Sequence, residues 1–216
     1  NIGFDGGLWY QSNCVSGNSS DIWQLKGRAG QAQGILGAYG YSKTGYWAKK
    51  LVNLGFVNTE SGWNSEQYPW PEFRLADLYL LYAEAVNEAS DSEVARTLAI
   101  SYVDKIRERA GLSGVKESWE EHSRKPNKFR TQLGLREIIQ RERTIELMFE
   151  GQRFWDVRRW KIADKEYNKT LMAWNPRGKT VDTYYQLTTM YTQQFVAPRD
   201  YFWPIKEKSL VICLLY

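Results

Sequence analysis

The chain has 216 residues, of which 15% are aromatic and 25% are charged, and 29 Lys and Arg against 25 Asp and Glu give a net charge of +4. This composition excludes a disordered or low-complexity chain, and no apolar run approaches the roughly 20 residues of a membrane-spanning helix. The charge is too small and too evenly spread to indicate nucleic-acid binding. The single histidine, His122, excludes any site that needs two.

Residues 1–72 combine frequent glycines with large aromatic side chains, and no helical period persists in them. We therefore predict loops and short extended segments. Rings in loops have two interpretations, packing into the core or stacking against a ligand. A flat ring suits the apolar C–H face of a pyranose as well as a nucleobase. The candidate platforms are Trp9, Tyr10, Trp23, Tyr39, Tyr41 and Trp47.

Two amphipathic helices are predicted next. The first covers residues 72–89, and the second begins after a cap at Asp91 or Ser92 and ends at Gly111. Two such helices joined by a short polar turn are similar to a tetratricopeptide hairpin. The apolar stripe of the first helix is expected at helical spacing: Leu75, Leu78, Tyr79, Tyr82, Ala83, Val86 and Ala89.

Residues 113–134 are polar, and we predict a loop there. A third helix is expected over residues 135–149 with Ile138, Ile139, Ile145 and Met148 as its apolar positions, and Gly151 breaks or kinks it. A short fourth helix carries Val157. After Asp164 no helical periodicity persists, and we predict only a turn at residues 175–178 and an extended segment at 202–205. Six rings are assigned to helix packing: Tyr79, Tyr82, Phe149, Phe154, Trp155 and Trp160.

Acidic residues recur every four positions in the third helix. Glu142, Glu146 and Glu150 share one face, where carboxylates are able to bind a metal or to transfer protons. The segment has no histidine for a helical di-iron motif, and it is rich in arginine. Ion pairs between helices are the preferred interpretation, with a carboxylate-based hydrolase as an alternative. The expected members are Arg143, Glu146, Glu150, Arg153, Asp156 and Arg159.

The other reactive residue types offer no site. His122 lies in a polar segment without a nucleophile elbow, so we expect a solvated loop histidine. Cys14 and Cys213 are too far apart in the chain for a zinc motif, and they indicate no redox compartment. No metal and no cofactor is predicted. The first residue is not Met and the apolar run at 210–216 stops abruptly, which indicates a fragment or a processed chain.

Several segments together resemble the C-terminal portion of the SusD/RagB family. They are residues 73–89 (FRLADLYLLYAEAVNEA), 103–112 (VDKIRERAGL) and 142–160 (ERTIELMFEGQRFWDVRRW). Residues 44–50 (TGYWAKK) and 203–205 (WPI) fit the same family in the same order. The ordered set is far more specific than any one of these motifs, whereas residues 206–216 depart from the family's usual tail.

The resemblance implies a mainly α fold, with tetratricopeptide-like helical hairpins and a large irregular loop region. The expected division is ligand loops at 1–72, a helical scaffold at 73–163, and loops with an extended segment at 164–216. The family's glycan contacts follow no fixed motif, so the six candidate rings depend on ring chemistry and loop location alone.

The resemblance also implies a function. Such proteins are surface-exposed lipoproteins of the Bacteroidetes outer membrane that bind oligosaccharide or polysaccharide and pass it to a SusC-like TonB-dependent transporter. They are not enzymes, and they touch the membrane through a lipidated cysteine that would lie upstream of this chain, so Cys14 is not that anchor. The alternative is a helical scaffold that docks a protein partner and has no ligand of its own.

Overall fold

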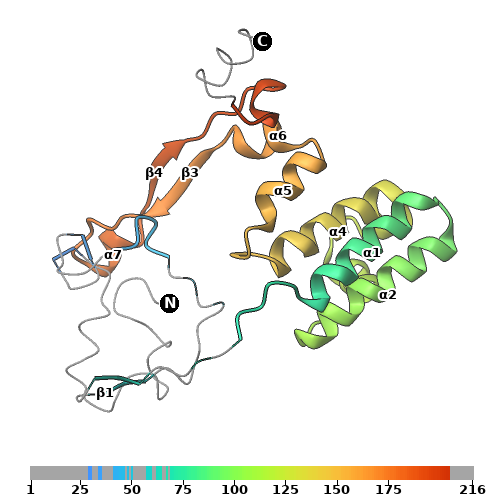
Figure 1. Cartoon of the computed structure of the whole chain (residues 1–216), viewed down its shortest axis with the longest axis horizontal. Helices are drawn as coiled ribbons and strands as arrows, with labels where there is room; N and C mark the ends of the chain where they lie inside the picture. The colour runs from blue at the N-terminus through green and yellow to red at the C-terminus, as the bar shows by residue number, and fades with distance from the viewer. Residues whose placement is uncertain are drawn as a thin grey trace, which may run out of the picture. The chain divides into compact units, whose positions relative to one another are not determined.

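The computed structural model describes residues 29–30, 34–35, 41–46, 48, 50, 57–59, 62–64, 67 and 69–204. The chain divides into two compact units (Figure 1). We call residues 69–155 the helical unit, and the described residues among 1–68 and 156–216 the hairpin unit. The described residues are mostly helical, which confirms the prediction of a mainly α fold. None of their helices is long and apolar enough to cross a membrane.

The helical unit is built on three helices that lie side by side (Figure 1). They are α1 (Leu75–Ala89), α2 (Glu93–Arg109) and α4 (Gln132–Glu146), and α1 packs against both of the others. The Ser92 hydroxyl caps α2 by accepting a hydrogen bond from the Ala95 amide at 3.1 Å. Gly111, with φ of +72°, follows the last turn of α2. The predicted helical hairpin is therefore present.

One apolar core fills the space between these helices. All three helices contribute fully buried members to it, among them Leu80, Ala83, Ala99, Val103, Leu135 and Ile139. Asn87 is also fully buried, and its side-chain amide donates to the Gln132 carbonyl oxygen at 3.1 Å. The Gln132 side chain donates in return to the Asn87 carbonyl oxygen at 2.7 Å. This exchange fixes the end of α1 against the start of α4.

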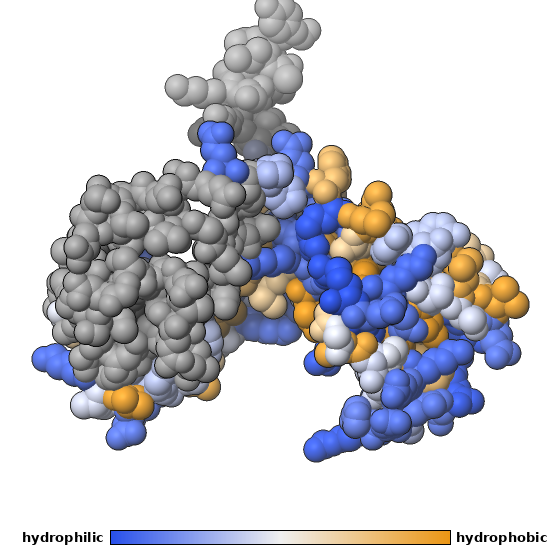
Figure 2. Space-filling view, turned by 90° about the horizontal axis from the view of Figure 1, so that it is seen from below, coloured by the Kyte–Doolittle hydropathy of each residue, from blue (hydrophilic) through white to orange (hydrophobic). Residues whose placement is uncertain are grey.

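The predicted apolar stripe of α1 is partly wrong. Ala83 is fully buried and Tyr79 and Val86 pack against the core, as predicted. Leu75, Leu78 and Tyr82 are exposed instead, and the inward face also carries Ala76, Leu80 and Asn87. The helix is apolar on two faces, so its periodicity alone did not show which one is buried. Small residues on the inner face let the neighbouring helices approach closely. Figure 2 shows apolar residues in orange at the surface of the helical unit.

Two further expectations for the helical unit are corrected. The segment 113–134 is not a loop, because it contains α3 (Val115–His122) and the 3₁₀ turn η3 (Lys128–Arg130). An Asp104 carboxylate oxygen accepts a hydrogen bond from the Val115 amide at 2.7 Å, which anchors the first turn of α3. The third predicted helix begins and ends three residues earlier than expected, so Met148 lies beyond α4.

The hairpin unit has its own small core. α5 (Gln152–Arg159) runs into this unit, and its Val157 packs with Ala163 and Phe195. α6 (Ala163–Tyr167) follows, and the 3₁₀ turn η4 (Arg199–Tyr201) lies at the other end. The Tyr201 hydroxyl accepts a hydrogen bond from the Ala163 amide at 3.1 Å. Two short strands, β1 (Val57–Thr59) and β2 (Gly62–Asn64), pair antiparallel.

The expectation that structure dissolves after Asp164 is also wrong. β3 (Thr170–Trp174) and β4 (Leu187–Thr192) form an antiparallel hairpin, with α7 (Val181–Tyr184) in the connection between them (Figure 1). The register pairs Trp174 with Leu187 and shifts between Leu171 and Met172. The strands are exposed over most of their length, with no clean alternation of buried and exposed positions. They therefore lack the period that identifies a strand in a sequence.

Of the rings assigned to helix packing, some are buried less than expected. Tyr79 is half-buried against the core and meets Tyr102 edge-on at 5.5 Å. Tyr82 lies 4.5 Å from Tyr102 between ring centroids, although it stays 45% exposed. Phe149 and Trp155 are 64% and 57% exposed, so these two rings pack less than expected. The two remaining rings of this set are half-buried: Phe154 and Trp160.

Candidate functional site

A pocket of about 500 Å³ opens beside the β3–β4 hairpin, within the hairpin unit. We call it the hairpin pocket. Tyr41, one of the six predicted ring platforms, lines it and is 41% exposed. The other five candidates lie outside the described residues: Trp9, Tyr10, Trp23, Tyr39 and Trp47. The lining residues come from three segments of the chain: Ile35, Tyr41, Lys43, Ala173, Trp174, Asn175, Pro176, Arg177, Thr188, Thr189, Met190 and Tyr191.

One wall of the hairpin pocket is the turn at residues 41–46. The Trp174 amide donates to the Thr44 carbonyl oxygen at 3.0 Å, which joins this turn to the end of β3. The Ser42 hydroxyl donates to the Tyr46 carbonyl oxygen at 2.7 Å and closes the turn on itself. Gly45 lies in the left-handed region with φ of +70°, which glycine adopts without a steric penalty. The turn therefore holds Tyr41 beside the hairpin.

A second wall is the turn after β3. The Asn175 side-chain oxygen accepts a hydrogen bond from the Arg177 amide at 3.1 Å, a local turn that asparagine favours. The Asn175 amide donates to the Tyr184 carbonyl oxygen at 2.9 Å. Gly178 packs so closely on α7 that an added Cβ would lie 2.4 Å from the Tyr184 nitrogen. This close packing fixes where the Arg177 backbone lies.

Aromatic rings pack against Trp174, which lines the pocket. Trp174 is half-buried, with its ring centroid 5.4 Å from that of Tyr46 and 5.2 Å from that of Tyr185, which it meets edge-on. Tyr185 in turn meets Tyr184 edge-on at 5.2 Å. Tyr184 is fully buried, and this burial raises the pKa of its phenol to about 12. Tyr191 lines the opening from β4 and is 47% exposed.

The pocket therefore combines a fixed ring with two exposed rings and several groups that form hydrogen bonds. Sequence reasoning treated residues 175–178 as a turn only, and it missed both Trp174 and Tyr191. The available signal was weak: β-branched and aromatic residues flank that turn at 170–174 and 187–192. Tyr41 and Tyr191 lie in segments far apart in the chain, so no local pattern unites them.

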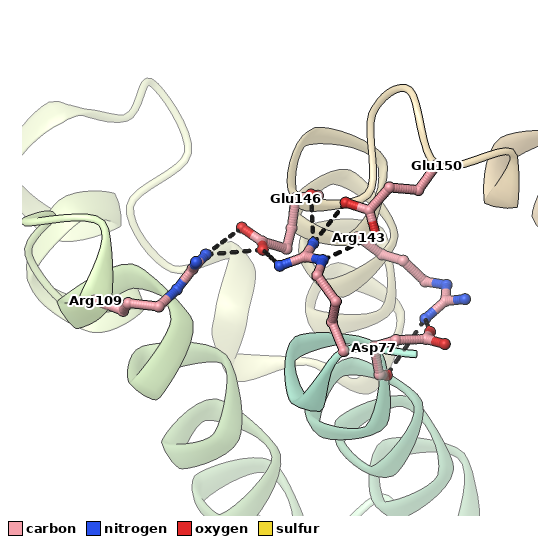
Figure 3. Close-up of polar contacts among 6 residues, drawn as sticks. Asp77, Arg109, Arg143, Glu146 and Glu150 are labelled. Carbon is pink, nitrogen blue, oxygen red and sulfur yellow. Dashed lines mark hydrogen bonds and ion pairs between the residues drawn. The ribbon is translucent and has the colours of Figure 1, made fainter. Parts of the chain in front are cut away.

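The acidic cluster of the helical unit is a set of ion pairs between helices (Figure 3). Arg74 bonds Glu146 at 2.7 Å and Glu150 at 2.7 Å, and Arg109 also reaches Glu146 at 2.7 Å. The hydrogen bond to Glu150 raises the pKa of the Arg74 guanidinium above its ordinary value, and the hydrogen bond to Glu146 raises this pKa as well. Arg143 pairs with Asp77 in the buried interior between α4 and α1. Arg74 and Arg109, outside the segment singled out in the sequence, supply these contacts.

The remaining members of the predicted set have close partners. Asp156 is buried, and its carboxylate accepts from Arg159 at 2.9 Å within α5. Arg153 donates to the Thr144 hydroxyl at 2.9 Å. Glu142 pairs with Arg107. Within the described residues, no group of three His, Cys, Asp or Glu side chains is placed to hold a metal ion.

His122 is the last residue of α3, so the expectation of a loop histidine is wrong in its secondary structure. Its side chain is 76% exposed, as a solvated histidine should be. A carboxylate oxygen of Glu121 lies 3.7 Å from its Nε2 atom. Cys14 and Cys213 both lie outside the described residues.

Comparison with known proteins agrees with this fold. The family model described as "SusD family" matches residues 1–211. A curated relative, SusD-like protein P2 of Formosa agariphila, is 33% identical over 138 residues, which are 64% of this chain and 23% of the relative. SusD-like protein P25 of the same organism is 40% identical over 109 residues, which are 48% of this chain and 18% of the relative. The chain thus spans less than a quarter of either relative.

A solved structure is similar as well. The crystal structure of a SusD-like protein from Bacteroides fragilis NCTC 9343 matches with a TM-score of 0.51 and 34% sequence identity. The match covers 67% of this chain and 26% of that protein. The helical hairpin, the ordered motifs and a family model that matches nearly the whole chain lead to one conclusion: this chain belongs to the SusD family.

Proposed function

We propose that this chain is part of a surface glycan-binding protein, which binds oligosaccharide or polysaccharide without chemical change. The protein delivers it to a SusC-like TonB-dependent transporter. It is a lipoprotein of the outer membrane that meets the bilayer through a lipid anchor outside this chain. The hairpin pocket, in a chain of this family, is the observation that carries the proposal.

The pocket has the chemistry that a saccharide requires. Its volume of about 500 Å³ lies within the range of roughly 300–1,000 Å³ that is usual for small-molecule sites. Tyr41 and Tyr191 offer exposed ring faces to the C–H face of a sugar, and Trp174 is held in place by its neighbouring rings. Asn175 and the hydroxyls of Thr188 and Thr189 supply polar groups beside these rings.

In this proposal each part of the chain has a role. Residues 1–72 supply loops whose rings extend the binding surface, residues 73–163 form the helical scaffold, and residues 164–216 bring the hairpin to the pocket. The five ring candidates outside the described residues are further stacking platforms: Trp9, Tyr10, Trp23, Tyr39 and Trp47.

Calorimetric titration of the protein against a panel of oligosaccharides tests the proposal. Tyr41→Ala and Tyr191→Ala are each expected to weaken binding about tenfold or more, since one stacked aromatic contact contributes roughly 1–3 kcal/mol in comparable systems. Leu78→Ala removes an exposed apolar side chain of the helical unit and serves as the control. If the intact protein binds no saccharide, or if both ring variants bind as tightly as the control, the proposal fails.

A non-catalytic role fits the pairing of the acidic cluster. Arg74 contacts both Glu146 and Glu150, which leaves these carboxylates in structural ion pairs. Chain length of a bound oligosaccharide, followed by chromatography after long incubation, should stay constant. Shortening that is lost in Glu146→Gln with the fold retained would instead show a hydrolase.

The exposed face of α1 favours a second function, the docking of a protein partner. Leu75, Leu78 and Tyr82 recur at helical spacing and are 58%, 55% and 45% exposed. A stripe of this kind suits burial against another protein, and the partner that this proposal names is the transporter. Leu78→Asp should reduce co-purification with a large β-barrel and leave saccharide binding intact, the reverse of the expectation for Tyr191→Ala. Unchanged co-purification of Leu78→Asp would contradict this second function.

A further inference from the structure

Among the described residues that line the hairpin pocket, the charged side chains are both cationic. Lys43 enters from the turn at 41–46 and Arg177 from the turn after β3, and no Asp or Glu is found among these described lining residues. From this we propose that the pocket selects acidic saccharides, in which a ring stacks on the aromatic side chains and a carboxylate or sulfate group binds the two cations. This inference rests on the proposed function and names its substrate class.

Neither cation has an ion pair within the part of the chain that the structure describes. Elsewhere in that part, arginines are regularly paired: Arg74 with Glu146 and Glu150, and Arg136 with Glu88. Lys43 and Arg177 are instead exposed, with no carboxylate partner among the described side chains. Two positive charges at one pocket repel each other, and a bound anion would offset this repulsion.

Backbone hydrogen bonds fix both turns that carry the cations. Lys43 precedes Thr44, whose carbonyl oxygen accepts from the Trp174 amide at 3.0 Å. The amide of Arg177 bonds the Asn175 side chain at 3.1 Å, and Asn175 follows Trp174 directly. Trp174 is therefore the common point from which both cation-bearing turns are fixed. Two segments far apart in sequence meet beside Trp174, and each brings one positive charge.

The two cations differ in what they recognise. The planar guanidinium of Arg177 matches the two oxygens of a carboxylate or sulfate, and the Lys43 ammonium acts as a compact charge. A free inorganic anion would engage these groups but leave the rings of Tyr41 and Tyr191 uncovered. A uronic acid or a sulfate ester on a sugar engages both parts of the pocket together. The shared chemistry is an anionic group on a pyranose.

Matched saccharide pairs test this selection by calorimetry. The first pair is oligogalacturonate and its methyl ester, and the second is dextran sulfate and dextran of equal length. The acidic member of at least one pair should bind about tenfold more tightly or better, the size of one charge-assisted hydrogen bond. The pair that shows this preference identifies carboxylate or sulfate. The affinity should fall as salt rises, because exposed charges are screened.

Variants connect the preference to the two cations. Lys43→Gln and Arg177→Gln should each weaken acidic binding, and the double variant should bind acidic and neutral members equally. Lys165→Gln removes an exposed cation of α6, away from the pocket lining, and should change nothing. Thermal unfolding of each variant should match the original protein, since both side chains are exposed.

Four outcomes separate this inference from the proposed function. Acidic preference that disappears in the double variant supports the inference. Equal binding of acidic and neutral members, weakened by Tyr191→Ala, overturns the inference and leaves the proposed function standing. Acidic preference that persists in the double variant also overturns the inference. Absence of binding to any saccharide overturns both.

Discussion

The Tyr184 phenol donates a hydrogen bond to the Gly45 carbonyl oxygen at 3.2 Å, across a separation of 139 residues in the chain. Together with the bond from the Trp174 amide to the Thr44 carbonyl oxygen, it holds the turn at 41–46 at two points. This turn carries Tyr41 and Lys43 into the hairpin pocket. The buried Tyr184 thus supports a ligand site that it does not line.

Tyr184→Phe should therefore cost stability and weaken binding. Loss of the hydroxyl removes one hydrogen bond to a buried carbonyl, and we expect unfolding free energy to fall by about 1 kcal/mol. Saccharide affinity should fall as well, although Tyr184 does not line the pocket. Urea unfolding and calorimetric titration measure the two effects. Unchanged affinity would show that the turn keeps its place without this bond.

The same residue predicts a high-pH transition. Burial raises the pKa of Tyr184 to about 12 from its ordinary value of 10. As pH rises, the folded state therefore keeps this proton to a higher pH than the unfolded state does. The contribution of the Tyr184 phenol to the unfolding free energy is complete below pH 10 and declines between pH 10 and 12. Urea unfolding at pH 9 and at pH 11.5 should show a larger loss in the original protein than in Tyr184→Phe. Equal losses would contradict the assignment.

A methyl group at Gly45 should disturb the turn that lines the pocket. A Cβ there would lie 2.7 Å from Trp174 Cβ and 3.0 Å from the Tyr184 hydroxyl, at a φ of +70°. Gly111 is a matched control, since its φ is +72° and a Cβ there meets nothing within 4 Å. Gly111→Ala should cost about 1–2 kcal/mol from backbone strain alone, whereas Gly45→Ala should cost more.

Chemical unfolding of both glycine variants gives the comparison, and saccharide titration adds a second measurement. Gly45→Ala should weaken binding, because the turn has to move away from Trp174 to make room. Gly111→Ala lies in the helical unit and should bind normally. Equal unfolding free energies for the two variants would show that Trp174 moves away from the added Cβ at position 45 without a loss of stability.

Local signals explain which elements were predictable. The helix α2 carries its own boundaries, with a capping hydroxyl at Ser92 and a glycine at 111. In α1 the sequence shows a helix but not its buried face, since both faces are apolar and tertiary packing selects between them. The β3–β4 hairpin was missed because its strands are exposed, and strand periodicity arises from burial on one side.

One residue that lines the candidate site could be predicted from the sequence. Tyr41 stood out as a ring in a glycine-rich segment, but nothing near it in sequence indicates Arg177 or Tyr191. The ion pairs show the same limit. The arginine-rich segment suggested pairing, but the partner Arg74 directly precedes α1 and the partner Arg109 ends α2. Partners across the fold depend on helix docking, which a local period does not encode.

Stability should also fall in acid. The Arg136 guanidinium, which donates to Glu88 at 2.6 Å, lowers the pKa of that carboxyl below its ordinary value of 4.5. A lowered pKa means that the contribution is present above about pH 4.5 and is lost as pH falls through the folded-state value. In Glu88→Gln, the unfolding free energy should therefore decline less steeply between pH 6 and pH 3 than in the original protein, as measured by urea unfolding. High salt should reduce the difference, because the pair is partly exposed.

An equal decline in Glu88→Gln and in the original protein would contradict this prediction. Glu137→Gln provides a second case, since Lys128 lies 2.6 Å from Glu137 and lowers its pKa in the same way. Both carboxylates are on the surface of the helical unit, so neither substitution disturbs the core. Each effect should be small.

The buried pair of Asp77 and Arg143 should behave differently from every exposed pair (Figure 3). The side chains are 11% and 3% exposed, so the loss of one partner leaves a charge inside the helical unit. Arg143→Met or Asp77→Leu should each cost about 3–5 kcal/mol of unfolding free energy, but the double variant should cost less than their sum. Arg130→Ala removes the exposed partner of Glu120 and should cost less than about 1 kcal/mol.

A double-mutant cycle in urea measures the coupling of Asp77 and Arg143. Additive losses would show that each residue acts through separate contacts. A large coupling would show that the charges stabilise the docking of α1 on α4 chiefly by neutralising each other. In that case the apolar residues around them hold the helices together, and the pair selects the register in which both charges meet, because any other register would bury a charge without a partner.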